Sequence, residues 1–374
     1  LAAFRKHSEF FRDRLAGVTS WADIPPLGKR ELAGMPVVHF ETGADAEIHD
    51  VRTSGTSGFQ ITVRNTLPER RFRQALAYRP FLFYPLDNAS HGAVHQVIFV
   101  DGNAVDAPDK QQWPFNFGAH TYLTWHAGIA ADPERILALL RAVQPQVIRG
   151  LASGIVRFVS EVNGPLDALG VQVVSPSGEQ LLPAWRELLS NAFGAPVLDR
   201  YGATETGSIA WQCPYCNDYH ANTDELILED SPQGLLATTL FIDSQPLLRY
   251  QLGDRVAFHA EAHDAAHECH IRLPTLTVLD ARRDDWLIDG AGRKVSPLSF
   301  QFERIAGLRA WRIHQLRTGE LRLYFDAEPT ADTQQQLTEH LQAIVPGRQV
   351  ELARGIWQLP SAGKFKRVVS DFTR

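Results

Sequence analysis

With 374 residues, 44% of them hydrophobic, the chain can bury a sizeable core, and its length favours a large and a small domain over a single one. A formal net charge of -6 and the lack of a long basic block argue against an extended nucleic-acid interface. No apolar run approaches the roughly 20 residues of a membrane-spanning helix, and only three cysteines favour a reducing compartment, with the cytoplasm as the default.

Strands and helices are predicted to alternate through the middle of the chain. In chain order, these elements are a helix from Asp132-Pro133, a strand at 146–148, a helix at 155–162, a strand at 171–174, a helix at 183–193 and a strand at 196–198. The alternation predicts an α/β fold with a largely parallel sheet covered by helices. Ligands of such sheets bind beyond the carboxyl ends of the strands, where polar clusters are expected at 175–179 and 199–205.

The character of the chain changes after Asp254. Residues 259–270 are rich in His, Asp and Ala, and we expect a loop or hairpin there. Beyond Arg283 the pattern predicts a compact unit with short strands, a helix carrying Leu337 and Leu341, and a basic tail. We therefore expect a large domain over residues 1–283 and a small one over residues 284–374.

One segment alternates small hydroxyl residues with glycines: Thr53, Ser54, Gly55, Thr56, Ser57 and Gly58. Such a loop lets backbone N–H groups approach an anion closely, so it could cradle phosphates, although a flexible turn has the same composition. It is not a Walker A loop, because Phe59 and Gln60 follow in place of a Gly-Lys-Ser/Thr sequence. A P-loop kinase is therefore disfavoured.

Three further segments carry side chains suited to nucleotide chemistry. In Tyr201-Gly202-Ala203-Thr204-Glu205 the glycine permits a tight turn after a strand, and Glu205 could hold Mg²⁺ against phosphates. Asp254 could accept hydrogen bonds from ribose hydroxyls. Lys364, which follows a glycine, could reach charge that develops on a transferring acyl phosphate. Taken alone, the Tyr201–Glu205 segment is more typical of a solvated turn and the Lys364 segment of a solvated terminus, and Asp254 could be an ordinary turn residue that caps a hairpin.

The order of these motifs, together with Arg282-Arg283-Asp284-Asp285 and Gly363-Lys364, resembles the acyl-adenylate-forming, AMP-binding superfamily. The closest resemblance is to its phenylacetate–CoA ligase branch, and it covers nearly the whole chain. The resemblance implies a large multi-layer adenylate-forming domain and a small, mobile α+β C-terminal domain. It also implies ATP-dependent activation of a carboxylic acid as acyl-AMP, with release of pyrophosphate. The acyl group would then pass to a thiol, of coenzyme A or of phosphopantetheine on an acyl carrier protein.

The resemblance assigns phosphate and metal contacts residue by residue. It implies that Thr53 to Gly58 bind the β- and γ-phosphates of ATP and that Thr204 contacts the α-phosphate. Glu205 would ligate Mg²⁺. Lys364 would bridge the substrate carboxylate and the α-phosphate in the first half-reaction. Positioning and charge neutralisation are what the attack of a carboxylate on phosphorus needs most.

The remaining implied roles concern the adenosine moiety, the acyl pocket and the hinge. Gly178 and Glu179 would line the adenine and acyl pocket, and Tyr201, beside Gly202, would stack near the adenine. Asp254 would hold the ribose hydroxyls, with Arg282 nearby. Asp284 would be the hinge about which the small domain rotates between the two half-reactions.

A cysteine–histidine cluster lies in the segment 213–270. Cys213, Cys216 and His220 have the spacing Cys-x₂-Cys-x₃-His, and Cys269 follows between two histidines. Thiolates and imidazole at this spacing suit a tetrahedral Zn²⁺, and a closed four-ligand site would be structural. One of the histidines beside Cys269 could replace a ligand. Reduced buried thiols are the alternative interpretation.

Other functions remain open at this point. The chain could stop at the adenylate, transferring AMP or passing the acyl group to an amine. It could also be a degenerate homologue that binds nucleotide or acyl ligand without turnover, because Phe59 replaces a polar residue in the phosphate loop. Several aromatic residues could line an acyl pocket or could belong to the core. They are Phe81, Phe83, Trp113, Phe115, Phe117, Tyr122 and Trp125.

Overall fold

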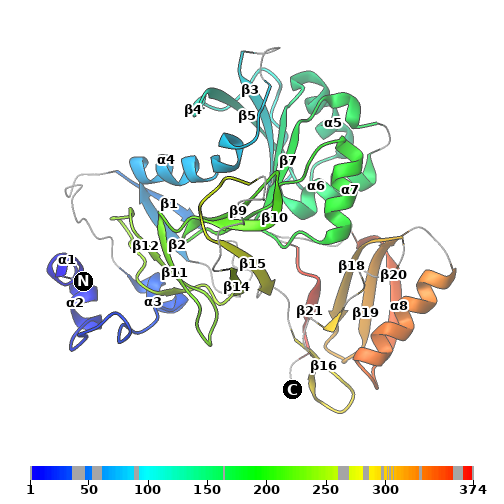
Figure 1. The fold of residues 1–374 in the computed structure, drawn as a ribbon. Coiled ribbons are helices and arrows are strands. Elements are labelled where there is room, and N and C mark those ends of the chain that lie inside the picture. Colours follow the sequence, from blue (N-terminus) through cyan, green and yellow to red (C-terminus); the bar gives the residue numbers. More distant parts are fainter. Residues whose placement is uncertain are drawn as a thin grey trace. The chain divides into compact units, whose positions relative to one another are not determined.

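The computed structural model describes residues 2–35, 47–52, 61–87, 92–162, 165–259, 269–280, 286–295, 299–300, 302, 305, 307–327, 331–356 and 365–372 (Figure 1). The chain divides into two compact units: the first comprises Leu1–Pro85 and Leu198–Arg282, and the second comprises Leu86–Val197 and Arg283–Arg374. Over the described residues, no helix combines the length and the apolar character of a membrane span. These compact units group the chain differently from the predicted domains 1–283 and 284–374. The division into those two domains stays a prediction.

The first unit consists of short helices and antiparallel strands. Its helices are α1 (Ala2–His7), α2 (Glu9–Arg14), α3 (Lys29–Gly34), α4 (Leu67–Leu76) and the 3-10 helix η1 (Arg79–Leu82). Its strands are β1 (Ile48–Arg52), β2 (Thr62–Thr66), β8 (Arg200–Ala203), β9 (Gly207–Cys213), β10 (Cys216–Ala221), β11 (Leu226–Glu229), β12 (Leu236–Thr239), β13 (Tyr250–Gln251), β14 (Arg255–His259) and β15 (Thr275–Asp280). Hydrogen-bonded neighbours follow in the orders β1-β2, β14-β15-β10-β9-β8 and β11-β12-β13.

Helix α4 begins directly after β2 with a reciprocal cap. The Thr66 hydroxyl accepts a hydrogen bond from the Glu69 amide, and the Glu69 carboxylate accepts one from the Thr66 amide at 2.6 Å. Pro68 occupies the first turn, where its missing N–H has no intrahelical partner to lose. This cap sets where α4 starts. Arg73 lies one turn after Glu69, so the start of the helix also sets the direction in which the Arg73 side chain points.

The second unit contains a parallel sheet followed by a smaller mixed sheet. Its elements are β3 (Val94–Val100), β4 (Phe115–Phe117), β5 (His120–Gly128), α5 (Pro133–Val143), β6 (Val147–Leu151), α6 (Ala152–Glu161), η2 (Asp167–Leu169), β7 (Val173–Ser177), α7 (Pro183–Phe193), β16 (Leu287–Ile288), β17 (Lys294–Val295), β18 (Leu308–Gln315), β19 (Leu321–Ala327), α8 (Ala331–Ile344), β20 (Val350–Arg354) and β21 (Val368–Ser370). Strands β7, β6, β3 and β5 pair in parallel, and β4 adds antiparallel to β5.

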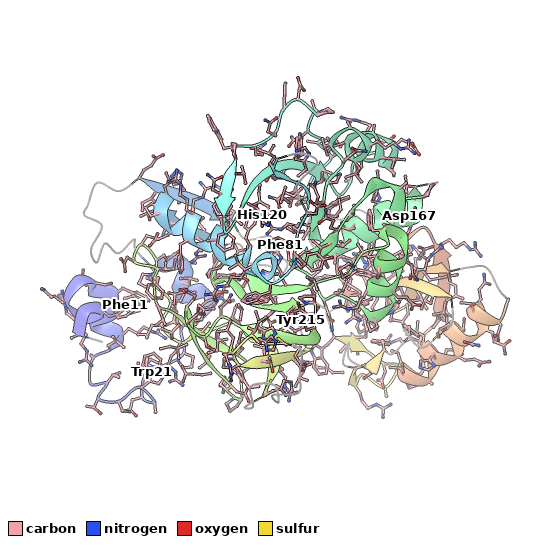
Figure 2. The ribbon with its side chains drawn as sticks, turned by 45° about the horizontal axis from the view of Figure 1, so that its top comes forward. Phe11, Trp21, Phe81, His120, Asp167 and Tyr215 are labelled. Carbon is pink, nitrogen blue, oxygen red and sulfur yellow. The ribbon has the colours of Figure 1, made fainter. Side chains whose placement is uncertain are left out.

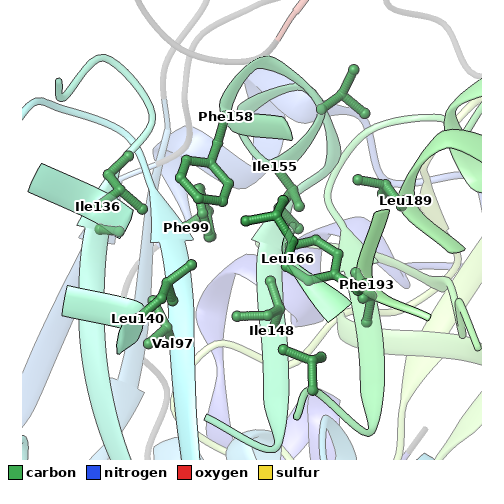
Figure 3. Close-up of a cluster of buried hydrophobic side chains, with 14 of the residues drawn as sticks. Val97, Phe99, Ile136, Leu140, Ile148, Ile155, Phe158, Leu166, Leu189 and Phe193 are labelled. Carbon is green, nitrogen blue, oxygen red and sulfur yellow. The ribbon is translucent and has the colours of Figure 1, made fainter. Parts of the chain in front are cut away.

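Helices α5, α6 and α7 cover one face of the parallel strands. Val97, Phe99 and Ile148 extend from this face and pack with helix residues that include Leu140 and Ile155 (Figure 3). All five side chains are buried. Because side chains alternate along a strand, the residues between them lie on the opposite face, and the helix-covered face carries most of the apolar core of this unit.

The C-terminal segment of the second unit has its own small core. Its strands follow in the order β20-β19-β18-β21, and α8 packs against them through Leu337 and Leu341. Ile313 and Leu323 complete the buried centre. Helix α7 is tied to this segment, because the Trp185 indole N–H donates to the Arg309 carbonyl at 2.9 Å.

The predicted α/β architecture and its parallel sheet are confirmed, with differences in detail. Helix α7 occupies 183–193 as predicted, bounded by Pro183 and by Gly194 at φ +64°. The strand predicted at 171–174 extends to Ser177, so the predicted polar cluster begins inside β7 and not after it. The strand predicted at 196–198 was wrong, because Val197 makes only an isolated bridge to Val174.

Candidate functional site

The Tyr201–Glu205 motif forms the β8–β9 hairpin of the first unit. Tyr201 and Gly202 lie in β8, and Thr204 and Glu205 lie in the turn that precedes β9. The prediction that Gly202 makes the turn was therefore wrong. The glycine instead allows close approach of the two strands, because a Cβ at this position would lie 2.4 Å from the Gly207 carbonyl oxygen.

Arg73 of α4 holds this turn in place through its guanidinium group. Its guanidinium donates to the carbonyl oxygens of Thr204, at 2.9 Å, and of Glu205, at 2.8 Å. Burial lowers the pKa of Arg73 to about 10, against the opposing effect of the carboxylates of Glu69 and Glu205. The side chain thus stays a cation at neutral pH and fixes the backbone of both motif residues. Sequence reasoning missed Arg73, because no local pattern ties α4 to a turn so distant in the chain.

Glu69, on the same helix, joins α4 to a second loop. Its carboxylate accepts hydrogen bonds from the amides of Asp243 and Ser244, at 2.7 and 2.8 Å, and from the Ser244 hydroxyl at 2.5 Å. Burial raises the pKa of Glu69, but the hydrogen bonds from Ser244, Thr66 and Asp243 together hold it below its ordinary value. The ionised carboxylate is therefore the form that the fold favours.

Two tyrosines orient the two predicted acidic residues. The Tyr201 hydroxyl donates to Asp254 Oδ2 at 2.7 Å, and the Tyr250 hydroxyl donates to Glu205 Oε1 at 3.1 Å. Asp254 lies between β13 and β14, and Tyr250 lies in β13. The structure therefore brings the Tyr-Gly-Ala-Thr-Glu motif and the Tyr-x-x-Gly-Asp motif together within one unit.

In the second unit, Glu179 lies after β7 at the N-terminus of α6. Gly178, at φ +82°, turns the chain there. The Glu179 carboxylate accepts hydrogen bonds from the Ser153 amide at 2.8 Å and the Ser153 hydroxyl at 3.0 Å, which places it against the positive end of the helix dipole. It also accepts from the Phe365 amide at 2.5 Å. The residue that follows Lys364 in the chain is thus anchored on Glu179.

The other predicted site residues lie outside the described residues. These are Thr53 to Gly58, Arg282, Asp284 and Lys364. The roles that the sequence resemblance implies for them stay predictions.

The aromatic residues considered for an acyl pocket have separate environments. Trp113 is 93% exposed. Trp125 is buried in the core beneath the helices of the second unit. In the first unit, Phe83 stacks on Trp211 with ring centroids 5.3 Å apart. Trp125 therefore belongs to the core, which is one of the two interpretations given above, and a pocket-lining role for the other aromatic residues stays a prediction.

Three of the predicted zinc ligands converge in the first unit. Cys213 ends β9, His220 lies in β10, and Cys269 precedes β15. The two sulfurs are 3.5 Å apart, and Cys269 Sγ lies 3.4 Å from His220 Nε2. All three residues are buried, and neither cysteine forms a disulfide. The Cys216 side chain lies outside the described part of the chain.

The turn between Cys213 and Cys216 carries Tyr215, which Figure 2 labels. The Tyr215 amide donates to Cys213 Sγ at 3.4 Å.

Comparison with known sequences gives a partial match. No protein-family model matches the chain. Indoleacetate–lysine synthetase from Pseudomonas savastanoi is 28% identical over 119 residues, which cover 31% of this chain and 30% of that protein. The match thus spans less than a third of the length of this relative.

Comparison with solved structures covers nearly the whole chain. 2-Hydroxyisobutyryl-CoA ligase in the postadenylation state has a TM-score of 0.73 at 17% identity, over 99% of this chain and 87% of that chain. The same ligase with 2-HIB-AMP and CoA in the thioesterification state has a TM-score of 0.57 at 18% identity, with the same coverage. An ATP-bound RpMatB-BxBclM chimera has a TM-score of 0.50 at 15% identity, over 81% of this chain and 63% of that chain. The predicted adenylate-forming ligase fold is thereby confirmed.

Proposed function

We propose that this chain is an adenylate-forming ligase, which activates a carboxylic acid with ATP and passes the acyl group to a thiol of coenzyme A or of a carrier protein. The observation that carries the proposal is the pairing of Tyr201 with Asp254 and of Tyr250 with Glu205. Two motifs from distant parts of the chain meet there, in a protein with the fold of acyl-CoA ligases.

In the first half-reaction, a carboxylate oxygen attacks the α-phosphorus of ATP. The new bond gives acyl-AMP, and the bond from the α-phosphorus to the bridging oxygen breaks, which releases pyrophosphate. Asp254, oriented by Tyr201, would accept hydrogen bonds from the ribose hydroxyls. Thr204 would donate to the α-phosphate. Holding these groups in place removes much of the entropic part of the barrier.

Glu205 would hold Mg²⁺, which when bound neutralises phosphate charge. An oxygen ligand suits this hard cation, and the hydrogen bond from Tyr250 fixes the orientation of the carboxylate. Arg73 holds the carbonyl oxygens of Thr204 and Glu205, so it acts as a positioning residue for both side chains. Lys364 would neutralise charge between the carboxylate and the α-phosphate, as the sequence resemblance implies.

Transfer of the acyl group to an amine is a second candidate for the second half-reaction. It is favoured by the local identity with indoleacetate–lysine synthetase, whose name describes the joining of an acid to an amino acid. Both candidates share the acyl-AMP intermediate, so the first half-reaction is tested first.

The test is ATP–pyrophosphate exchange with a panel of acids that includes indoleacetate, phenylacetate, 2-hydroxyisobutyrate and fatty acids. We expect acid-dependent exchange, lost in Asp254→Ala and in Lys364→Ala, and kept in Asp109→Ala, which removes an exposed aspartate. Coenzyme A, a carrier protein or lysine is then added with the preferred acid to identify the acceptor.

Each outcome of this assay decides one part of the proposal. Exchange that survives in Lys364→Ala would remove that lysine from the mechanism. No exchange with any acid, in a protein that still binds ATP, would contradict the proposed activity and favour a non-catalytic nucleotide-binding homologue.

A further inference from the structure

The buried cysteine–histidine cluster of the first unit is a second site, with chemistry that adenylation does not use. Cys213 and His220 come from the β9–β10 hairpin and Cys269 from the segment before β15, and their ligand atoms all lie within 4.8 Å of one another. Cys213 and Cys269 are 56 residues apart in sequence. Such convergence of two thiols and an imidazole needs an explanation beyond chance burial.

The distances differ from those of a disulfide. Bonded sulfurs lie about 2.05 Å apart. The two sulfurs here are 3.5 Å apart, and neither cysteine forms a disulfide. A covalent bridge between Cys213 and Cys269 is thus absent from this structure.

The distances instead fit the edges of a metal tetrahedron. With Zn–S near 2.3 Å and Zn–N near 2.1 Å, a tetrahedral site has S···S edges of about 3.8 Å and S···N edges of about 3.6 Å. The observed separations are 3.5 Å between the sulfurs and 3.4 Å between Cys269 Sγ and His220 Nε2. A small expansion of the cluster would therefore admit a Zn²⁺ ion.

The surroundings hold two of the ligands in place. The Tyr215 amide donates to Cys213 Sγ at 3.4 Å. Trp211 packs on His220 with ring centroids 5.2 Å apart and restricts the imidazole.

We propose that Cys213, His220 and Cys269 bind one Zn²⁺ ion, with Cys216 as the fourth ligand. In the backbone, Cys216 pairs with Cys213 across the two-residue turn of the β9–β10 hairpin. A closed set of four protein ligands leaves no position for substrate, so the ion is structural. It joins the β9–β10 hairpin to the segment that precedes β15, and in this way it fixes the strand that begins just after the Thr204–Glu205 turn.

The test is the metal content of the purified full chain, measured by elemental mass spectrometry together with cobalt spectroscopy. We expect one zinc per chain in the unaltered protein and in His270→Ala, which removes an exposed histidine next to Cys269. Cys213→Ser, His220→Ala and Cys269→Ser should lose stoichiometric zinc. Co²⁺ in place of Zn²⁺ should give the charge-transfer absorption of thiolate ligation, and this absorption should decrease in Cys216→Ser.

Removal of zinc from the unaltered protein makes the test independent of whether the variants fold. A strong chelator should lower the unfolding temperature, and added Zn²⁺ should restore it. The proposal is overturned if the purified protein contains no zinc and binds none from solution, or if non-reducing mass spectrometry finds a Cys213–Cys269 disulfide. An unchanged cobalt spectrum in Cys216→Ser would remove Cys216 from the ligand set. None of these results depends on adenylation activity.

Discussion

At the scale of single residues, two charged side chains of α4 determine the local geometry of the first unit. Arg73 donates to the carbonyl oxygens of the Thr204–Glu205 turn, and Glu69 accepts hydrogen bonds from the loop at Asp243 and Ser244. Each charged group has at least two hydrogen-bond partners, which lowers the cost of keeping the charge in buried surroundings. The two loops therefore depend on one helix.

Arg73→Met should weaken both stability and activity. The substitution removes two hydrogen bonds and leaves two carbonyl oxygens without a donor, which costs about 2–4 kcal/mol of unfolding free energy. Denaturant unfolding measures this loss, and ATP–pyrophosphate exchange should fall mainly in its maximal rate, because the turn is held less firmly. Arg73→Lys should recover only part of the loss, since a lysine cannot bridge both carbonyls as a guanidinium does.

The control for this prediction is Arg70→Met, an exposed position on the same helix. It should change stability by less than about 0.5 kcal/mol. Equal effects at Arg70 and Arg73 would contradict the positioning role.

Glu69 should make the unfolding free energy of the protein depend on pH in the acidic range. Its pKa lies below the ordinary value in the folded chain, so its ionised form contributes stability above the unfolded pKa, near 4.5. That contribution is lost as the pH falls through the lower, folded value. The unfolding free energy of the unaltered protein should thus decline more steeply below this pH than that of Glu69→Gln. Glu187→Gln, at an exposed glutamate, should behave like the unaltered protein.

At the scale of elements, the β8–β9 hairpin depends on close backbone contact. Gly202 faces the Gly207 carbonyl, and the strand register shifts between Tyr201 and Gly202. The hairpin carries Tyr201 on one strand and Thr204 and Glu205 in its turn. Any change in the strand spacing therefore moves the residues proposed to contact the nucleotide.

Gly202→Ala should destabilise the protein by about 1–3 kcal/mol, because the new methyl group would lie 2.4 Å from the Gly207 carbonyl oxygen. Gly34→Ala is the matched control. Its Cβ would meet nothing within 4 Å, so it should be neutral or slightly stabilising. Thermal unfolding of the two variants measures the difference, and equal melting temperatures would argue against the close contact.

At the scale of the whole chain, each compact unit is assembled from two segments far apart in sequence. In the second unit, the C-terminal end returns to α7 and β7. Phe365 packs on Trp185 with ring centroids 5.7 Å apart and donates its amide to Glu179, and Arg367 donates to Gln180 at 2.9 Å. These contacts anchor the chain on the C-terminal side of Lys364.

Phe365→Ala should loosen this end of the chain. Loss of the aromatic contact should speed tryptic cleavage at Lys366 and Arg367, because local opening of the segment becomes less costly. Limited proteolysis followed by mass spectrometry gives the rate. Phe258→Ala, at an exposed position in the first unit, should leave this rate unchanged. A cleavage rate unaffected by Phe365→Ala would mean that the contact contributes little.

The sequence by itself determined several of the helices and strands, and it predicted the chemistry of the motifs. Pro183 and Gly194 bounded α7, and apolar periodicity predicted α5, because these features act through the local backbone and its immediate neighbours. The order of the motifs also predicted the ligase fold that the solved structures share.

Only the tertiary structure decided which residues meet. Tyr201 pairs with Asp254 across 53 residues, and Arg73 reaches Thr204 across 131. Strand register and helix packing set these pairs, and neither can be predicted from the local amino-acid composition. The sequence already included Cys269 with Cys213 and His220 among the candidate zinc ligands, and the pairing of β10 with β15 shows how the fold brings Cys269 close to the other two.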